Sequence, residues 1–267
     1  MKTVFFGRDG RQSTRPLESL AKRFEILRVV GPSYEKGGNL ENFARHLKVE
    51  MRRVSHLDPS LADGADLLVF SNFPKRVPAS LLERPKFGCL NLHPSLLPDF
   101  RGYSPWLWQF YHAEKEGGWT VHLMDEGLDT GPVLAQSKFT IPFGIDVSDL
   151  IDGVLQSGAD LLSDTALAWV KGELTAVPQI GSGRPAPKTE RGARLVNWKE
   201  WPVRRVYHFI NGTSPWHEAL PSAWGWRWRP LNWEEASHSQ RPGSLRWRPG
   251  GWRVYCRDGW ILLKLCR

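Results

Sequence analysis

Two short segments decide how this chain is interpreted: Asn-Leu-His-Pro-Ser-Leu-Leu-Pro at 91–98 and Met-Asp-Glu-Gly-Leu-Asp-Thr-Gly at 124–131. An apolar run with strand character precedes each of them. Each segment therefore places polar, titratable side chains where a strand is expected to end in a turn. In open α/β sheets, ligands bind beyond the carboxyl ends of the strands. These two segments are therefore the first candidates for a functional site.

The residue types in these segments suit chemistry at a carbonyl group. Asn91 and His93 are two residues apart, so on an extended backbone they point to the same face. The prolines that follow His93 restrict the backbone and would hold the pair rigidly. If Asp129 approaches His93, it orients the ring and favours its charged form. An amide and an imidazolium could then donate to an oxyanion while the carboxylate handles a proton.

Each of these residues also has an ordinary structural explanation. A histidine after a strand is often hydrogen-bonded for structural reasons, and an aspartate in a glycine-containing turn is usually a turn former. His122 lies inside an apolar strand and is as consistent with core packing as with catalysis. The residues taken singly leave both interpretations open.

The flanking sequence alternates apolar strands with amphipathic helices. Strands are predicted at 3–7, 26–30, 50–54, 66–70, 88–92 and 133–139, and helices at 16–24, 40–47, 78–83 and 146–171. Asp146 is the expected N-cap of the last helix. This alternation predicts an α/β fold: a Rossmann-like, mostly parallel sheet with helices on both faces.

The turn Gly7-Arg8-Asp9-Gly10 invites a nucleotide-binding interpretation, but the full G-x-G-x-x-G pattern is absent. We favour an ordinary strand-to-helix turn, although a loop at this place could still contact an acceptor.

The C-terminal part of the chain differs in composition. Residues 191–267 contain 14 Lys/Arg against 5 Asp/Glu, whereas the whole chain has 36 against 28. Ten of the fourteen tryptophans lie at or after Trp198. A short helix is expected at 201–210 and strands at 243–247, 252–257 and 259–265. We therefore predict a catalytic domain at 1–180, a basic Gly/Pro-rich linker at 181–194 and a small β domain at 195–267, the last with an anionic partner.

Several classes of protein are disfavoured by the sequence. No apolar run approaches the roughly 18 residues that span a bilayer, and the N-terminus is expected to be a strand rather than a signal peptide. The three cysteines are scattered and have no metal-ligand spacing. The expectation is a cytoplasmic protein without a disulfide framework, a membrane contact or a metal.

The order and spacing of the motifs resemble one known family. N-x-H at 91–93, S-L-L-P at 95–98, F-R-G at 100–102 and L-D-x-G at 128–131 resemble the 10-formyltetrahydrofolate-dependent formyltransferases. The resemblance covers most of residues 1–190. It implies an enzyme that transfers a formyl group from 10-formyltetrahydrofolate, its co-substrate, to a primary amine.

The resemblance also implies residue roles. Asn91 and His93 would hold the oxyanion of the tetrahedral intermediate, Asp129 would position His93 and water, and His122 would support them. The pterin ring would lie between two loops, with contacts from Phe73, Pro74, Val77, Met124, Asp125, Glu126 and Leu128.

The acceptor is less defined. Residues 194–198 and 206–216 resemble the start of the oligonucleotide-binding-type (OB-like) C-terminal β-barrel of methionyl-tRNA formyltransferases, here shortened and incomplete. The basic charge agrees with a tRNA-borne amine, and the Trp/Arg alternation at 224–229 suits base stacking. For any single tryptophan, packing in the barrel core is the favoured explanation. Against tRNA, residues 32–39 hold only one lysine beside one glutamate. A nucleotide-linked amino sugar, or a catalytically silent nucleic-acid-binding relative, stays open.

Overall fold

The structure is a computed structural model that describes residues 1–189, 195–214 and 227–266. The chain divides into two compact units. The first holds Met1–Pro105, Gly117–Phe139 and Gly153–Pro187, and the second holds Trp106–Glu116, Thr140–Asp152 and Lys188–Arg267. The predicted domain limits of 1–180, 181–194 and 195–267 stay predictions.

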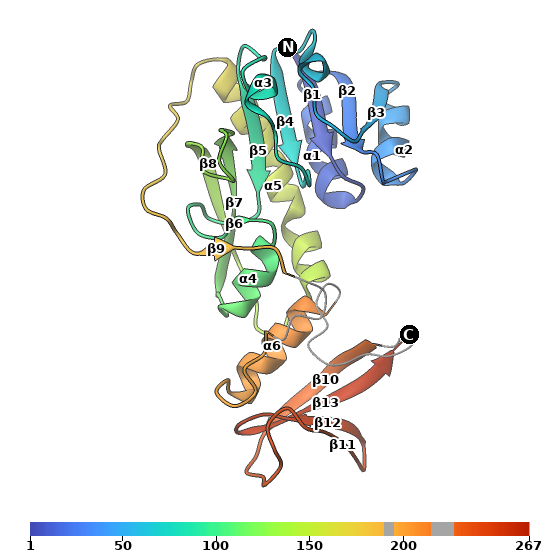
Figure 1. Ribbon diagram of the computed structural model, residues 1–267, viewed down its shortest axis with the longest axis vertical. Helices are drawn as coiled ribbons and strands as arrows, with labels where there is room; N and C mark the ends of the chain where they lie inside the picture. The colour runs from blue at the N-terminus through green and yellow to red at the C-terminus, as the bar shows by residue number, and fades with distance from the viewer. Residues whose placement is uncertain (190–194, 215–226, 267) are drawn as a thin grey trace. The chain divides into compact units, whose positions relative to one another are not determined.

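A seven-stranded sheet organises the first unit, with the strand order β3-β2-β1-β4-β5-β7-β8 (Figure 1). Its strands are β1 (Lys2–Gly7), β2 (Glu25–Pro32), β3 (Glu50–Val54), β4 (Leu67–Ser71), β5 (Cys89–His93), β7 (Glu116–Leu123) and β8 (Val133–Thr140). The pairings from β3 to β5 are parallel, and β5 pairs antiparallel with β7. The predicted mostly parallel sheet is confirmed.

Both faces of this sheet are covered, because alternate residues of β1 contact different elements. Val4 and Phe6 pack with residues of the 3₁₀ helix η1 (Pro59–Ala62) and of α3 (Ala79–Leu82). The other face, that of Phe5 and Gly7, lies against α1 (Arg11–Ala21). Ser19 on α1 donates to Asp160 of α5 (Val147–Val170) at 2.8 Å, which places α5 beside α1. The remaining helix of this part is α2 (Asn39–His46).

Helix α1 begins at Arg11, five residues before the predicted start, and contains Pro16. A proline inside a helix leaves the carbonyl four residues earlier without its usual donor. Here that carbonyl belongs to Gln12, and it accepts from the Ser71 hydroxyl at 2.7 Å. A hydrogen bond from Ser71 of β4 therefore replaces the one that Pro16 cannot make. The predicted cap of α5 is present, since Asp146 Oδ1 accepts from the Ser148 N–H at 2.7 Å.

In the second unit, four strands form an antiparallel sheet in the order β10-β13-β12-β11. They are β10 (Arg227–Glu235), β11 (Leu245–Arg248), β12 (Gly251–Tyr255) and β13 (Gly259–Cys266). The predicted small β module is confirmed, but among the described strands it is an open sheet with edges β10 and β11. Strand β10, whose register shifts between Pro230 and Asn232, was not predicted from the sequence.

Two helices accompany this sheet in the second unit. They are α4 (Pro105–Tyr111), which the sequence analysis missed, and α6 (Val203–Thr213), near the predicted 201–210. The Asp258 carboxylate accepts from the Val203 N–H at 2.7 Å and so caps α6 from the β12–β13 turn. On the same helix, His208 Nδ1 accepts from the Gly144 N–H at 3.0 Å.

The first residues of the predicted linker are held by contacts with another part of the chain. Pro185–Ala186 forms β9, which pairs parallel with β6 (Arg101–Gly102). Arg184 forms an ion pair with Asp99 at 2.8 Å. A Gly/Pro-rich composition indicates the absence of regular structure, yet such a segment can still be fixed by tertiary contacts. Residues 190–194 of the predicted linker lie outside the described residues.

In the described part of the chain, no helix combines the length and the apolar character that crossing a bilayer requires.

Candidate active site

The pairing of β5 with β7 brings three polar side chains together. Asn91 lies opposite His122, and His93 lies opposite Thr120. Directly opposed residues of an antiparallel pair share a face of the sheet. Asn91, His93 and His122 therefore point to one side, at the end of β5.

Asp129 reaches the same place from the turn that follows β7. The turn is tight: a Cβ on Gly131 would lie 1.9 Å from the Leu123 carbonyl oxygen, so only glycine fits. Asp129 itself adopts a left-handed backbone with φ of 56°. Its Oδ2 accepts from the Gly102 N–H at 2.9 Å.

The structure brings the three predicted catalytic residues together around this carboxylate. Asn91 Nδ2 lies 3.3 Å from Asp129 Oδ1 and 3.1 Å from His122 Nε2. His93 Nδ1 lies 3.6 Å from Asp129 Oδ2, and His122 Nε2 lies 3.6 Å from Asp129 Oδ1. Asp129 is thus the centre of a cluster with one amide and two imidazoles.

Neighbouring carbonyls fix which nitrogen of each ring carries a proton. His93 Nε2 is 2.9 Å from the Phe100 carbonyl, and His122 Nδ1 is 2.8 Å from the Leu123 carbonyl. A carbonyl oxygen only accepts, so these two nitrogens must be the donors. In the neutral rings, His93 Nδ1 and His122 Nε2 then carry lone pairs. The His122 lone pair accepts from the Asn91 amide.

Burial and charge set the protonation of the cluster. Burial lowers the pKa of His93, against the opposing effect of the Asp129 carboxylate. Burial alone would raise the pKa of Asp129, but the two histidines and the Gly102 N–H hold that pKa well below its usual range. At neutral pH the cluster therefore holds an ionised Asp129 beside a neutral His93.

The loop that carries the Phe100 carbonyl is held by polar contacts, two of them buried. Thr120 Oγ1 accepts from the Leu97 N–H at 3.1 Å and donates to the Ser95 carbonyl at 2.6 Å. Gln136 Nε2 donates to the Leu97 carbonyl at 2.9 Å. Because β7 and β8 provide these partners, the loop after His93 is tied to two neighbouring strands.

Comparison with known proteins agrees with this geometry. Residues 42–165 match the family model described as formyl transferase. A methionyl-tRNA formyltransferase of Listeria monocytogenes is 31% identical over 220 residues, which cover 80% of this chain and 69% of that protein. The chain belongs to the formyltransferase family.

Two further similarities define the extent of this relationship. A methionyl-tRNA formyltransferase of Thermodesulfovibrio yellowstonii is 34% identical over 166 residues, and the chain spans only 52% of its length. Among solved structures, an N-formyltransferase from Helicobacter canadensis in complex with folinic acid and dTDP-3-aminofucose has a TM-score of 0.74. It is 16% identical, with 98% of both chains covered, so it shows the fold alone.

The two loops expected to bind folate share one part of the core. Phe73, Val77 and Met124 pack against the same apolar cluster, which includes Phe70. Asp125 is used within its own turn, where its Oδ1 accepts from Gly127 N–H at 3.0 Å and Thr130 Oγ1 at 2.7 Å. The other expected contacts are the half-buried Pro74 and the exposed Glu126 and Leu128. Their role in binding folate stays a prediction.

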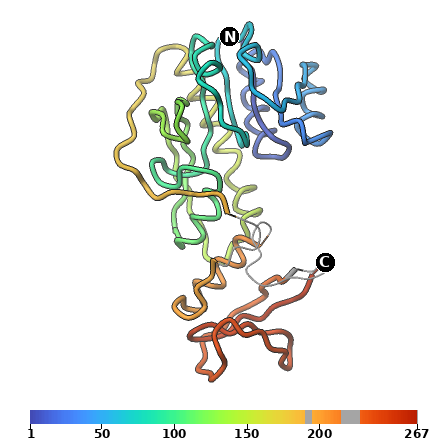
Figure 2. The backbone as a smooth tube through the Cα atoms, viewed as in Figure 1, coloured from blue at the N-terminus to red at the C-terminus, as the bar shows by residue number. Residues whose placement is uncertain are grey.

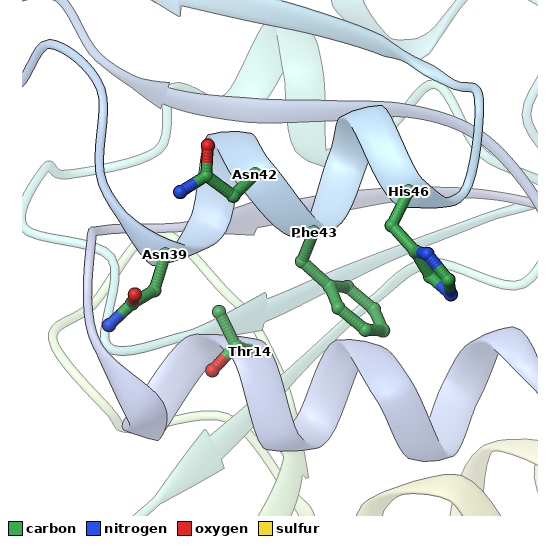
Figure 3. A pocket seen from close by; sticks show the side chains of 5 residues that line it. All are labelled: Thr14, Asn39, Asn42, Phe43 and His46. Atoms are coloured by element: carbon green, nitrogen blue, oxygen red, sulfur yellow. The ribbon is translucent and has the colours of Figure 1, made fainter.

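A separate open cavity of about 300 Å³ lies between α1 and α2 (Figure 3). Its lining consists of Thr14, Asn39, Asn42, Phe43 and His46. None of the predicted site residues lines it. Among the described residues, no group of His, Cys, Asp and Glu is arranged to hold a metal ion.

Two groups that contact the cluster were not predicted from the sequence. One is the Phe100 carbonyl, which no side-chain pattern can reveal. The other is Gln179, which donates to the Asp129 carbonyl at 2.9 Å from the segment before the predicted linker. Gln179 lies in an irregular segment, so no periodicity marks it.

Proposed function

We propose that the protein transfers a formyl group from 10-formyltetrahydrofolate to a primary amine. The observation that carries this proposal is the buried cluster of Asn91, His93 and Asp129, whose side chains meet at the end of β5. Membership of the formyltransferase family supports the same reaction. In the related Helicobacter canadensis protein, folinic acid is the bound folate.

The first step is attack of the amine on the formyl carbon, which turns the formyl oxygen into an oxyanion. The donors proposed for it are the Asn91 amide and the His93 Nε2–H. In the structure the latter donates to the neutral Phe100 carbonyl. A charged acceptor forms a stronger hydrogen bond than a neutral one. It is therefore favourable for the His93 N–H to exchange the Phe100 carbonyl for the oxyanion as its acceptor. This exchange provides the transition-state stabilisation that the reaction needs.

The second requirement is a place for the proton that the amine loses. The His93 Nδ1 lone pair faces Asp129 Oδ2 at 3.6 Å. A proton bound at this nitrogen would lie against the carboxylate, which stabilises the imidazolium. Asp129 thus positions His93 and relays this proton to N10 of the folate. When the intermediate collapses, the bond between the formyl carbon and N10 breaks, which releases tetrahydrofolate and the N-formyl product.

For the acceptor we infer a methionyl-tRNA, which is the substrate in the names of the sequence relatives. The C-terminal sheet supports a large anionic partner. In its register Arg246 lies opposite Arg253, and Arg229 lies opposite Lys264. Arg253 lies opposite Leu262, two residues from Lys264, so all four cations share one face. Arg253 also stacks 3.7 Å from the Trp260 ring centroid. Such a face suits phosphates and bases.

A nucleotide-linked amino sugar is the second candidate. The fold neighbour from Helicobacter canadensis holds dTDP-3-aminofucose and covers the chain almost completely. The loop at 32–39 also offers little positive charge to tRNA. Its Glu35 accepts from Arg8 at 3.1 Å and lies 3.9 Å from Arg53, so its negative charge offsets part of the positive charge nearby.

The test is a transfer assay with 10-formyltetrahydrofolate and three acceptors: charged initiator tRNA, dTDP- or UDP-amino sugars, and glycinamide ribonucleotide. Formylation of the charged tRNA, with binding that weakens as salt is raised, is the expected result. Formylation of an amino sugar alone would favour the second candidate. Transfer to none of them would leave a catalytically silent nucleic-acid-binding relative, the third alternative.

A further inference from the structure

The turn that carries Asp129 is held in an unfavourable backbone conformation. Its φ of 56° is left-handed, a region that side-chain-bearing residues rarely adopt. Such a conformation persists only where the surroundings determine it. The carbonyls of Asp129 and Gly131 both accept from Gln179 Nε2, at 2.9 Å and 2.7 Å. One side-chain amide therefore bonds to both ends of this turn.

The orientation of that amide is itself determined. Gln179 Oε1 accepts from Arg101 Nε at 2.9 Å and from Arg101 Nη2 at 2.7 Å. The reversed amide would turn an NH₂ group toward the guanidinium and an oxygen toward two carbonyls, so neither set of bonds could form. Arg101 thus directs the donor end of Gln179 at the Asp129 turn.

The backbone around these residues is closely fitted. Figure 2 shows the chain after α5 swinging outward before it returns beside residues 101–102. At that return a Cβ on Gly102 would lie 2.4 Å from the Ala186 carbonyl oxygen. The N–H of the same Gly102 donates to Asp129 Oδ2. The backbone of Asp129 is therefore held by Gln179 and its carboxylate by Gly102, and Arg101 links the two contacts.

We propose that Gln179 is a positioning residue of the formyl-transfer site: directed by Arg101, it holds the turn that aims the Asp129 carboxylate at His93. This proposal rests on the proposed function. The groups that face Asp129 are Asn91 and His93 on β5, His122 on β7 and the Gly102 N–H on β6. Displacement of the turn changes all of these contacts together. The chemical step would slow more than folate binding would weaken.

The experiment compares Gln179→Met, Gln179→Glu and the matched control Gln156→Met in the full-length protein. Methionine keeps the length of the side chain and removes every polar contact. Glutamate keeps the acceptor for Arg101 and replaces the NH₂ donor by an oxygen that faces two carbonyls. Gln156 lies on α5 and donates to Asp160 of the same helix at 2.9 Å, so it controls for the substitution itself.

Two measurements are made on each variant. Hydrogen exchange of the Gly102 amide, followed by NMR in the substrate-free protein, reports the position of the Asp129 carboxylate. We expect it to be at least about 10-fold faster in both Gln179 variants, with the other protected amides unchanged. Steady-state kinetics should show kcat lowered about 30- to 100-fold with KM for the folate changed less than about 3-fold, the size of effect produced by small misplacement.

The results distinguish a failure of the role proposed for Gln179 from a failure of the proposed formyl transfer. If the wild-type protein formylates no acceptor, the proposed function fails, and the Gly102 exchange still decides whether Gln179 holds Asp129. Wild-type Gly102 exchange in both Gln179 variants overturns the proposal. So does a loss of kcat that the control shares. If Gln179→Met does not fold, Gln179→Glu, which retains the Arg101 contact, decides.

Discussion

The cluster around Asp129 and the basic face of the C-terminal sheet are built in opposite ways. In the cluster, the side chains of His93 and His122 are only 5% and 2% exposed, and each lies 3.6 Å from Asp129. On the sheet, Arg229, Arg246 and Lys264 are exposed and share one face, on β10, β11 and β13. The first arrangement specifies a reaction, and the second provides distributed charge.

This difference predicts how each region responds to substitution. In a buried network, loss of one partner leaves the others unsatisfied, so single changes have large effects. On a charged face, contributions are screened by salt and accumulate gradually. Single substitutions should therefore disable the cluster, whereas only combined ones should disable the sheet.

The largest effect is expected for His93→Ala. The variant loses both a donor to the oxyanion and the proton acceptor beside Asp129, so kcat/KM should fall about 10³- to 10⁴-fold. Initial rates of formyl transfer measure this, with circular dichroism as the control for folding. Near-normal turnover in the folded variant would show that the cluster is not the active site.

A smaller effect is expected when Arg229, Arg246 and Lys264 are all changed to Gln. Affinity for tRNA should fall by about 10²-fold, and the slope of log K against log salt should become shallower by about 2–3. The kcat at saturating acceptor should not change. Filter binding at several salt concentrations tests this. An unaltered salt slope would remove the sheet from the proposed acceptor site.

The second unit also contains a pH-sensitive group. Burial lowers the pKa of His208 to about 4, and its Nδ1 accepts from Gly144 as a neutral ring. The folded state thus binds this proton less readily than the unfolded one. The stability it contributes is complete above pH of about 6.5 and is lost as the pH falls toward 4, by about 2–3 kcal/mol.

Urea unfolding at pH 7 and pH 4.5 measures this loss. His208→Asn keeps an acceptor for the Gly144 N–H and cannot titrate, so its free energy of unfolding should fall less over the same range. An equal fall in both proteins would contradict the assignment. His93 and Asp129, whose pKa values are also lowered, contribute acid sensitivity of the same sign to both proteins.

The smallest effect is expected for Trp247→Ala. Its ring is 62% exposed at the edge of the sheet. Removal should change the free energy of unfolding by no more than about 0.5 kcal/mol. Thermal unfolding checks this, and a shift beyond that range would show that the ring packs as core rather than facing an acceptor. Trp224 and Trp226, part of the Trp/Arg stretch expected to stack bases, lie outside the described residues.

Parts of the fold that depend on local pattern could be predicted from the sequence. The strand at 50–54 agrees with β3, and the cap at Asp146 is present, because strand patterning and helix caps are local properties. The start of α1 could not be predicted. Pro16 argues against a continuous helix, and the compensating donor is Ser71, far along the chain.

The candidate site also divides into features that follow from local pattern and features that depend on tertiary structure. Asn91 and His93 could be placed on one face from their spacing alone. From spacing alone, a contact between these two residues and Asp129 could only be assumed. The resemblance to a known family implied that contact. Gln179 and the Phe100 carbonyl could not be predicted, since they depend on how an irregular segment and a loop return to the sheet.

The most direct test of the account compares wild-type protein with Asp129→Asn in a transfer assay with 10-formyltetrahydrofolate and the three acceptors. The substitution preserves shape and removes the charge. The wild-type protein should release tetrahydrofolate and formylated acceptor in equal amounts, and Asp129→Asn should do so at least about 10³-fold more slowly. Equal rates in the two proteins would contradict the central claim that the Asp129 cluster carries out the reaction.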